Sequence, residues 1–409
     1  MSITQRPELL SPAGDQERLE AAVLYGADAV YLGGKMFGMR ASPQNFDPEA
    51  LAEAVRFCHE RDVNVYLTCN TLPTNADIDR LPEFFNMAKK SCVDALIVAD
   101  IGVLMAARRA CPDMDIHIST QAGVVNYLAA NELHALGANR VVLARELSLE
   151  DIALIREKTP PSLEIEAFVH GAMCMSFSGR CLISQYLTAR DANHGACAQP
   201  CRWAYHLMEE KRPGQFFPVF QDSEGSYILN ARDLSMLAHI DKLAQAGVGS
   251  FKIEGRAKSA YYVAVVTNAY RCAIDLYKKN PMSFEIPEWL VNETRKVSHR
   301  QYSTGFYFSH HEPGQYYESG GYVREWDVAA IVEDWRDDMI ICSERNRFFT
   351  GDMLEILEPG KIPVPLPVTK IYDMDGKALN AARKPMEKIA VPHRNKVIKG
   401  AIIRKIKEI

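Results

Sequence analysis

The first 280 residues alternate between two hydrophobic patterns. Short apolar runs, typical of buried parallel strands, are separated by segments in which apolar residues recur every third or fourth position. Leu51, Ala54 and Val55 show this helical spacing, and Asp47-Pro48 supplies a helix start in front of them. We expect eight strands, at Glu8–Leu10, Ala29–Leu32, Asn64–Thr68, Ala95–Val98, Ile116–Ser119, Arg140–Leu143, Leu163–Val169 and Ser250–Ile253.

Three helix-to-strand junctions carry a related motif. Gly26-Ala-Asp-Ala-Val-Tyr-Leu32, Gly137-Ala-Asn-Arg-Val-Val-Leu143 and Gly247-Val-Gly-Ser-Phe-Lys-Ile253 each place a glycine after a helix and a buried strand after the glycine. Eight such units in roughly 250 residues have the size of a (β/α)8 TIM-like barrel. An open doubly wound sheet is the second interpretation, because topology is hard to establish from one sequence.

The pattern changes after residue 280. Residues 281–321 predict one helix, at 286–299, and then a linker rich in glycine and aromatic residues. From residue 322 to 409 the chain alternates short apolar runs with turn signals, which predicts a small β-barrel. Its expected strands are Val328–Val332, Met339–Cys342, Met353–Ile356, Val368–Tyr372, Lys388–Val391 and Ala401–Ile406.

Charge refines this outline. The whole chain of 409 residues has a net charge of −5, which argues against a general nucleic-acid coat protein. Residues 383–409 nevertheless carry nine Lys or Arg against two acidic residues. Such a segment is either an ordinary solvated surface or a grip for RNA phosphates. No apolar run approaches the ~18 residues of a membrane span. The first residues show no apolar signal segment, so we expect a cytoplasmic protein.

Four of the ten cysteines fall within 28 residues, with the spacing C-x6-C-x15-C-x3-C. The other six are scattered singly in apolar surroundings, where a thiol behaves as a small hydrophobe. Disulfides would need an oxidising compartment, and zinc usually takes more closely paired cysteines. An iron–sulfur cluster accepts thiolates from irregular loops. We therefore favour an iron–sulfur cluster over zinc, with the ligands Cys174, Cys181, Cys197 and Cys201.

The cysteine stretch, at about 171–225, follows the seventh predicted strand, so it would be an insertion on the face of a barrel where active sites form. Lys252, Glu254 and Arg256 alternate along the last strand and would share one face. Arg145 and Arg232 would add positive charge suited to carboxylate or phosphate ligands. The alternative is an ion-paired barrel interior without a substrate.

Two more residues are candidates because of their position. His170 ends the seventh strand beside the first cysteine, and Arg180 lies directly before Cys181. His170 and Glu254 are the candidate catalytic residues, and Arg180 is a candidate for binding substrate or cluster sulfide. A lone histidine is more often a hydrogen-bonded structural group, so this alternative stays open for His170.

Long motifs in the chain resemble a known family. They are Glu166-Ala-Phe-Val-His-Gly-Ala-Met-Cys174, Gly179-Arg-Cys181-Leu-Ile-Ser184, Cys197-Ala-Gln-Pro-Cys201-Arg-Trp203, Asn230-Ala-Arg-Asp-Leu234, Glu8-Leu-Leu-Ser-Pro-Ala-Gly14 and Tyr25-Gly-Ala-Asp-Ala-Val-Tyr31. They are similar to peptidase family U32, the collagenase-like peptidases, and within it to the branch that modifies tRNA to 5-hydroxyuridine.

The resemblance implies an activity. In that branch the wobble uridine of tRNA is hydroxylated without molecular oxygen, with a 4Fe–4S cluster and with prephenate, a small dicarboxylate, as co-substrate. The partners implied are tRNA and a paralogous protein. A collagenase-like peptidase, hydroxylation of another RNA, and a non-catalytic binding module are the alternatives. The sequence has no G-x-S-x-G or H-E-x-x-H motif, which weakens the peptidase interpretation.

Overall fold

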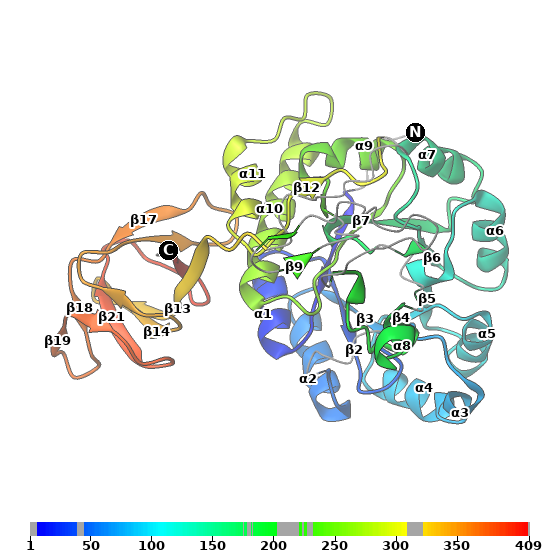
Figure 1. Cartoon of the computed structure of the whole chain (residues 1–409), viewed down its shortest axis with the longest axis horizontal. Coiled ribbons are helices and arrows are strands. Elements are labelled where there is room, and N and C mark those ends of the chain that lie inside the picture. Colours follow the sequence, from blue (N-terminus) through cyan, green and yellow to red (C-terminus); the bar gives the residue numbers. More distant parts are fainter. Residues whose placement is uncertain are drawn as a thin grey trace, which may run out of the picture.

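Eight parallel strands close into a barrel in the N-terminal part of the chain (Figure 1). The computed structural model describes residues 6–38, 45–174, 176–177, 181, 183–202, 221–222, 225–226, 232–308 and 322–407. Each barrel strand pairs with the next, and the last one pairs with both its predecessor and the first. The strands are β1 (Glu8–Pro12), β2 (Ala29–Gly33), β3 (Asn64–Cys69), β4 (Ala95–Val98), β5 (Asp115–Ile118), β6 (Arg140–Val142), β7 (Glu164–Ala172) and β11 (Ser250–Ile253). This closure confirms the TIM-like barrel over an open sheet.

Helices surround the barrel and start where the sequence predicts. Asp47, for example, accepts a hydrogen bond from the backbone N–H of Ala50 at the start of its helix. The helices are α1 (Gln16–Leu24), α2 (Pro48–His59), α3 (Asn75–Ile78), α4 (Leu81–Lys90), α5 (Ile101–Ala110), α6 (Tyr127–Ala135), α7 (Leu149–Glu157), α8 (Ile183–Thr188), α9 (Ile240–Gln245), α10 (Ala260–Lys279) and α11 (Glu288–Arg295). Their buried faces join the strands in one large apolar core.

The three glycines of the repeated motif have the backbone conformation that their position requires. Gly26, Gly137 and Gly247 follow α1, α6 and α9 with φ of +97°, +107° and +89°. Residues with a Cβ rarely adopt this left-handed conformation. Each glycine also leaves room for an arginine side chain from another helix, such as Arg108 beside Gly137. The glycines therefore serve helix termination and packing together.

Short strands extend the barrel sheet beyond the predicted eight. β10 (Asp233–Ser235) runs antiparallel to β7, and β12 (Tyr302–Ser303) pairs with β10. A separate pair consists of β8 (Gln221–Asp222) and β9 (Gly225–Ser226). β10 and β12 place the chain that follows the cysteine stretch against the outer edge of β7.

The C-terminal domain is a curled antiparallel sheet with a core of its own. In spatial order its strands are β17 (Val364–Pro367), β16 (Met353–Leu357), β22 (Ile402–Ile406), β13 (Trp326–Arg336), β14 (Met339–Glu344), β21 (Lys388–Pro392), β18 (Ile371–Tyr372) and β19 (Ala378–Leu379). A two-stranded pair, β15 (Phe348–Phe349) and β20 (Ala381–Ala382), lies beside them. All six predicted strands are present, and β17, which contains two prolines, is the one that the pattern misses.

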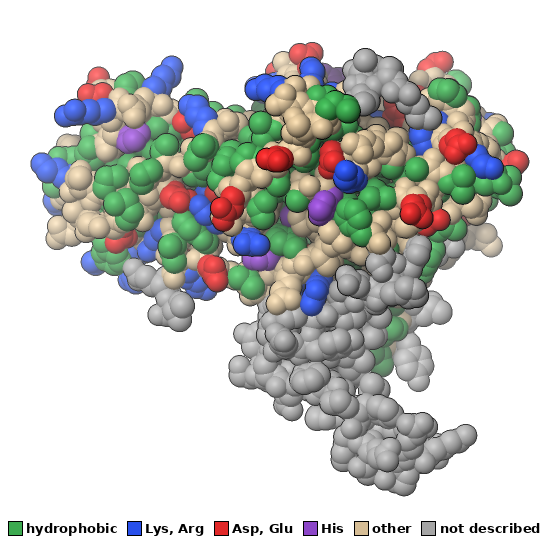
Figure 2. Space-filling view, turned by 90° about the horizontal axis from the view of Figure 1, so that it is seen from above, with side chains coloured by type: hydrophobic (Ala, Val, Ile, Leu, Met, Phe, Trp, Pro, Cys, Tyr) green, Lys and Arg blue, Asp and Glu red, His purple; other side chains and the backbone are tan. Residues whose placement is uncertain are grey.

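The basic segment at residues 383–407 is divided between surface and interior. Lys396 and Lys399 are exposed, whereas Arg404 is completely buried. On the face shown in Figure 2, Lys and Arg side chains of this domain are interleaved with hydrophobic and acidic ones. The segment therefore does not form one continuous basic patch on that face.

Arg404 connects the two domains. Its guanidinium binds Glu293 of α11 at 2.7 Å and Glu355 of β16 at 2.9 Å. Tyr25, after α1, donates to the carbonyl of Leu357 at 3.0 Å. Figure 1 shows the C-terminal sheet beside the helices that carry these residues. The domains are joined by buried polar contacts. None of the helices in the described part of the chain is long and apolar enough to cross a membrane.

Candidate functional site

A large cavity opens at the carboxyl ends of the barrel strands. Its volume is about 1150 Å³, and we call it the mouth cavity. Its wall includes residues at the ends of β3, β5, β6, β7 and β11, among them Thr68, Ser119, Val142, Phe168 and Lys252. This is the end of a TIM barrel at which loops are free to vary and catalytic residues gather.

All four clustered cysteines line the mouth cavity. Cys174 follows β7 and is exposed, while Cys181, Cys197 and Cys201 are half-buried. The backbone N–H of Ile183 donates to the sulfur of Cys181, and the N–H of Gln199 donates to that of Cys197, each over 3.4 Å. The structure therefore brings residues from 28 positions of sequence to one wall.

The donor set fits an iron–sulfur cluster better than a single metal ion. Among the described residues, no three Cys, His, Asp or Glu side chains stand together as ligands of one ion. In a 4Fe–4S cluster each thiolate binds a different iron, so the four sulfurs spread around a bulky group, and backbone N–H groups donate to them. Four cysteines around one cavity, two of them with such N–H donors, match these needs.

Thiols elsewhere in the chain have different surroundings. Burial raises the pKa of Cys58 and of Cys342 to about 12, with nearby carboxylates acting in the same direction. These thiols stay protonated at neutral pH and pack as small apolar groups. The contrast expected between the clustered and the scattered cysteines is present in the structure for these two.

An ion pair forms one side of the mouth cavity. Arg145 binds the carboxylate of Glu254 at 2.8 Å and donates to the carbonyl of Ala172 at 2.8 Å. Its guanidinium lies 3.7 Å from the centre of the Phe168 ring. Both charged side chains keep contact with the cavity. An arginine fixed in this way presents its charge in one orientation, at low entropic cost to ligand binding.

Arg256 is held still by neighbouring strands. It donates to the hydroxyl of Thr68 at 3.2 Å and to the side chain of Asn45 at 2.7 Å. A Cβ atom at Gly33 would overlap the guanidinium, so only glycine leaves space for it there. Lys252, Glu254 and Arg256 all line the mouth cavity, as their alternation predicts. The strand itself ends at Ile253.

Lys252 also belongs to an ion network inside the barrel. It binds Glu166 at 2.7 Å, and Glu166 accepts from Arg140 at 3.0 Å. Burial opposes ionisation of Glu166, but Lys252 and Arg140 together hold the pKa of its carboxyl below the ordinary value. The alternative of an ion-paired interior therefore holds for Lys252, whose position also reaches the cavity.

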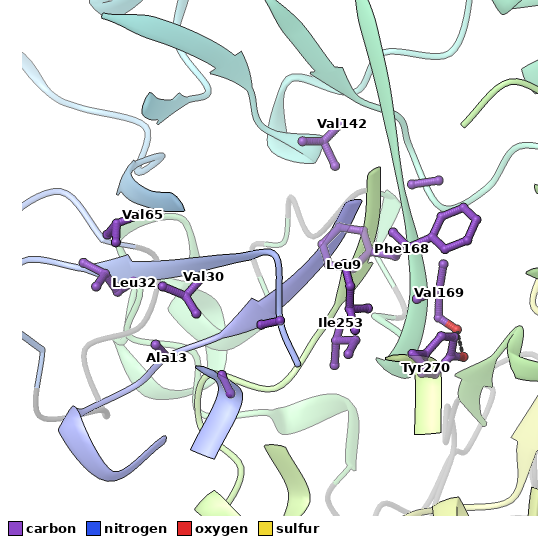
Figure 3. Packing of buried hydrophobic residues seen from close by; sticks show 14 of the residues in the cluster. Leu9, Ala13, Val30, Leu32, Val65, Val142, Phe168, Val169, Ile253 and Tyr270 are labelled. Carbon is purple, nitrogen blue, oxygen red and sulfur yellow. Dashed lines mark hydrogen bonds between the residues drawn. The ribbon is translucent and has the colours of Figure 1, made fainter. Parts of the chain in front are cut away.

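Three predicted residues are not part of the cavity wall as described. His170 is 1% exposed and is packed among the rings of Tyr262, Tyr270 and Tyr302. Figure 3 shows Tyr270 beside β7, where its hydroxyl donates to the carbonyl of Val169. Burial, helped by His299 and Lys258, lowers the pKa of His170 to about 3.

His170 therefore remains neutral, and its predicted catalytic role has no contact with the cavity to support it. Arg232 is likewise not among the lining residues. Arg180 lies outside the described residues.

The cavity also includes residues that the sequence analysis did not select. It continues to the junction with the C-terminal domain, where it is lined by Lys258, Tyr322, Arg324, Trp326 and Lys407. A signal existed in the run Tyr322-Val-Arg-Glu-Trp326, which places aromatic and basic residues directly after the linker. Lys407, by contrast, reaches the cavity through the pairing of β22 with β13, which the sequence does not reveal.

Comparisons with known proteins agree with this architecture. The family model described as peptidase family U32 matches residues 14–316, and the model for the U32 C-terminal domain matches residues 324–404. A Bacillus subtilis relative, tRNA hydroxylation protein P1, is 36% identical over 98% of this chain and 96% of its own length. The Escherichia coli 23S rRNA 5-hydroxycytidine C2501 synthase is 38% identical over 73% of this chain and 44% of its own. A Porphyromonas gingivalis protein named collagenase is 36% identical over 73% of each chain.

Proposed function

This chain belongs to peptidase family U32, and from that membership we propose that it is an RNA hydroxylase acting on tRNA. Two of its relatives are named for hydroxylation of tRNA and for synthesis of 5-hydroxycytidine in rRNA. The finer proposal is conversion of the wobble uridine to 5-hydroxyuridine without molecular oxygen, with prephenate as co-substrate. An anticodon loop suits such chemistry because its bases can leave the stack at low cost.

The observation that carries the proposal is the convergence of four cysteines and several cations on one cavity. Cys174, Cys181, Cys197 and Cys201 would hold a 4Fe–4S cluster. Hydroxylation replaces the hydrogen on C5 of uracil and removes two electrons from the ring. A bound cluster supplies electron transfer, which side chains alone do not provide. The cavity then brings a redox group and an RNA base within one enclosure.

The remaining wall residues have roles in binding and proton transfer. Arg145, Lys252 and Arg256 would bind the carboxylates of a small dicarboxylate co-substrate, since guanidinium groups match carboxylates in shape and charge. Glu254 would accept the proton released from the base, and Arg145, 2.8 Å away, keeps its carboxylate in place. Arg180 and Arg232 remain candidates for further anion contacts.

Complementation in bacteria tests this function. In a strain that lacks its own tRNA hydroxylation protein, the wild-type chain is expected to restore 5-hydroxyuridine, measured by mass spectrometry of tRNA nucleosides. Cys174→Ala is expected not to restore it. Cys92→Ala removes an exposed thiol outside the cavity and serves as the matched control. Restoration by Cys174→Ala would contradict the proposal.

Peptide hydrolysis is the second candidate, because one relative is named collagenase. No histidine is among the described residues that line the mouth cavity, so a cysteine or serine there has no imidazole base. Gelatin cleavage by protein purified without oxygen would decide the matter. We expect no cleavage, and cleavage lost in Cys174→Ala would favour the peptidase.

A further inference from the structure

The mouth cavity is a cationic feature of an acidic protein. Its described lining contains seven Lys or Arg residues and three Asp or Glu residues, although the whole chain carries a net charge of −5. A concave surface with this excess of positive charge attracts anionic ligands. The excess extends well beyond Arg145 and Arg256, because Lys258, Arg324 and Lys407 lie at the end near the C-terminal domain.

That end combines the cations with aromatic rings. We call Lys258, Tyr322, Arg324, Trp326 and Lys407 the junction strip. The Lys258 ammonium lies 4.2 Å from the centre of the Tyr322 ring, and the Arg324 guanidinium lies 5.8 Å from it. Tyr322 and Trp326 are half-buried, so part of each ring remains open to the cavity. Basic groups interleaved with aromatic rings are typical of surfaces that bind single-stranded nucleic acid.

Two of the cations are available for a ligand. Arg324 and Lys407 are exposed, and within the described residues neither forms an ion pair with a carboxylate. Arg324 donates to the hydroxyl of Ser298 at 3.2 Å, which orients its side chain along the barrel side of the junction. Exposed cations without carboxylate partners are suited to phosphates, whose binding releases condensed counterions.

The two walls of this region are fixed relative to each other. Trp326 lies against Lys296 and Arg404, at 4.5 and 5.3 Å from its ring centre. Arg404 is fully buried and binds carboxylates of both domains. The aromatic rings are therefore placed before a ligand arrives, which lowers the entropy cost of binding.

From these contacts we infer that the junction strip binds the single-stranded RNA that flanks the target nucleotide. This rests on the proposed function and identifies where the substrate runs. The target base enters the barrel mouth beside the cysteines, and the adjoining nucleotides pass toward the C-terminal domain. Their bases stack on Tyr322 and Trp326 while Lys258, Arg324 and Lys407 contact phosphates. Stacked duplex RNA cannot present its bases to rings in this way.

The test measures binding of a fluorescently labelled tRNA anticodon stem–loop by anisotropy, at several salt concentrations. Arg324→Ala/Lys407→Ala is expected to weaken binding by about tenfold or more and to flatten the salt dependence by about one unit of slope. Arg394→Ala/Lys399→Ala removes the same charge from exposed positions of the same domain that do not line the cavity. This control is expected to bind like the wild type.

A second pair of variants separates stacking from folding. Tyr322→Leu is expected to lose about fivefold or more in affinity, because a base loses its aromatic neighbour. Tyr322→Phe keeps the ring and is expected to retain affinity. Melting temperatures of both variants show whether the fold is intact.

The outcomes distinguish this inference from the proposed function. If wild-type protein binds no RNA, both fail. If RNA binds and Arg394→Ala/Lys399→Ala weakens it while Arg324→Ala/Lys407→Ala does not, the junction strip alone is overturned. Displacement of the RNA by gelatin peptides would also overturn it, because the strip would then be a peptide site.

Discussion

At the scale of single residues, the most constrained position in the mouth cavity is that of Arg256. Its guanidinium occupies the space above Gly33 and is held by Thr68 and Asn45. Gly33→Ala is expected to displace it and to cost about 1–3 kcal/mol of stability by overpacking. Since a hydrogen bond to a charged group contributes about 1.5–3 kcal/mol, the KM for the dicarboxylate co-substrate should rise roughly tenfold or more.

The neighbouring glycine provides a control for that prediction. A Cβ at Gly38 would lie 3.7 Å from the same guanidinium, an ordinary contact. Gly38→Ala should therefore change neither stability nor KM appreciably. Equal effects of both variants, in steady-state kinetics and thermal melting, would show that Arg256 does not bind the co-substrate.

A pH effect is expected from His170. Burial lowers its pKa to about 3, whereas an unfolded histidine has a pKa of about 6.5. Between these values only the unfolded chain takes up the proton, so stability falls as the pH falls through this window. The slope from this residue is about 1.4 kcal/mol per pH unit. In His170→Asn, the loss of stability between pH 6.5 and 5.5 should be smaller by about 1 kcal/mol, measured by denaturant unfolding. An unchanged loss would show that His170 is not neutral in the folded protein.

At the scale of helices and strands, the repeated glycines make a testable unit. Gly137 has a φ of +107°, and a Cβ there would lie 2.9 Å from Nε of Arg108. Gly137→Ala should lose about 1 kcal/mol for the backbone conformation and more for the displaced arginine. Gly376 has a φ of +84°, and a Cβ there would meet no atom within 4 Å, so Gly376→Ala should show the backbone cost alone. Equal losses of stability in thermal unfolding would mean that the arginine contact contributes nothing.

The strands were predictable because buried parallel strands are continuous apolar runs that end at turn residues. The ranges Ala95–Val98 and Ser250–Ile253 agree with the prediction at both ends. β17 escaped because Pro365 and Pro367 leave no apolar run, although an edge strand tolerates proline. β7 continues to Ala172 rather than Val169, because β10 pairs with its end. A pairing of that kind cannot be inferred from local sequence.

At the scale of the whole molecule, Arg404 decides how the domains sit. Arg404→Met would leave Glu293 and Glu355 without this buried partner, which is expected to cost about 3–5 kcal/mol. Because Trp326 lies against the same guanidinium, affinity for the anticodon stem–loop should fall as well. Lys405→Met, on the next residue, is the control. Chemical unfolding and anisotropy check both effects, and retained stability would show that the domains are held by other contacts.

The candidate site was predictable only in part. The cysteines and the charged residues after β11 stood out because spacing and alternation are local properties of a sequence. Tyr322, Trp326 and Lys407 did not, because they approach the barrel mouth through the packing of a second domain. His170 was selected for its place at a strand end, but the surrounding tyrosines turn it away from the cavity into the protein interior.

The closure of the barrel has a consequence for how the protein matures. The last strand carries Ser250, which hydrogen-bonds to Glu8 across 242 positions of the chain. All four cysteines therefore leave the ribosome before the segment that completes the cylinder. A nascent chain exposes its thiols while the floor beneath them is still missing, so delivery of iron and sulfide and completion of the fold are separable events in time.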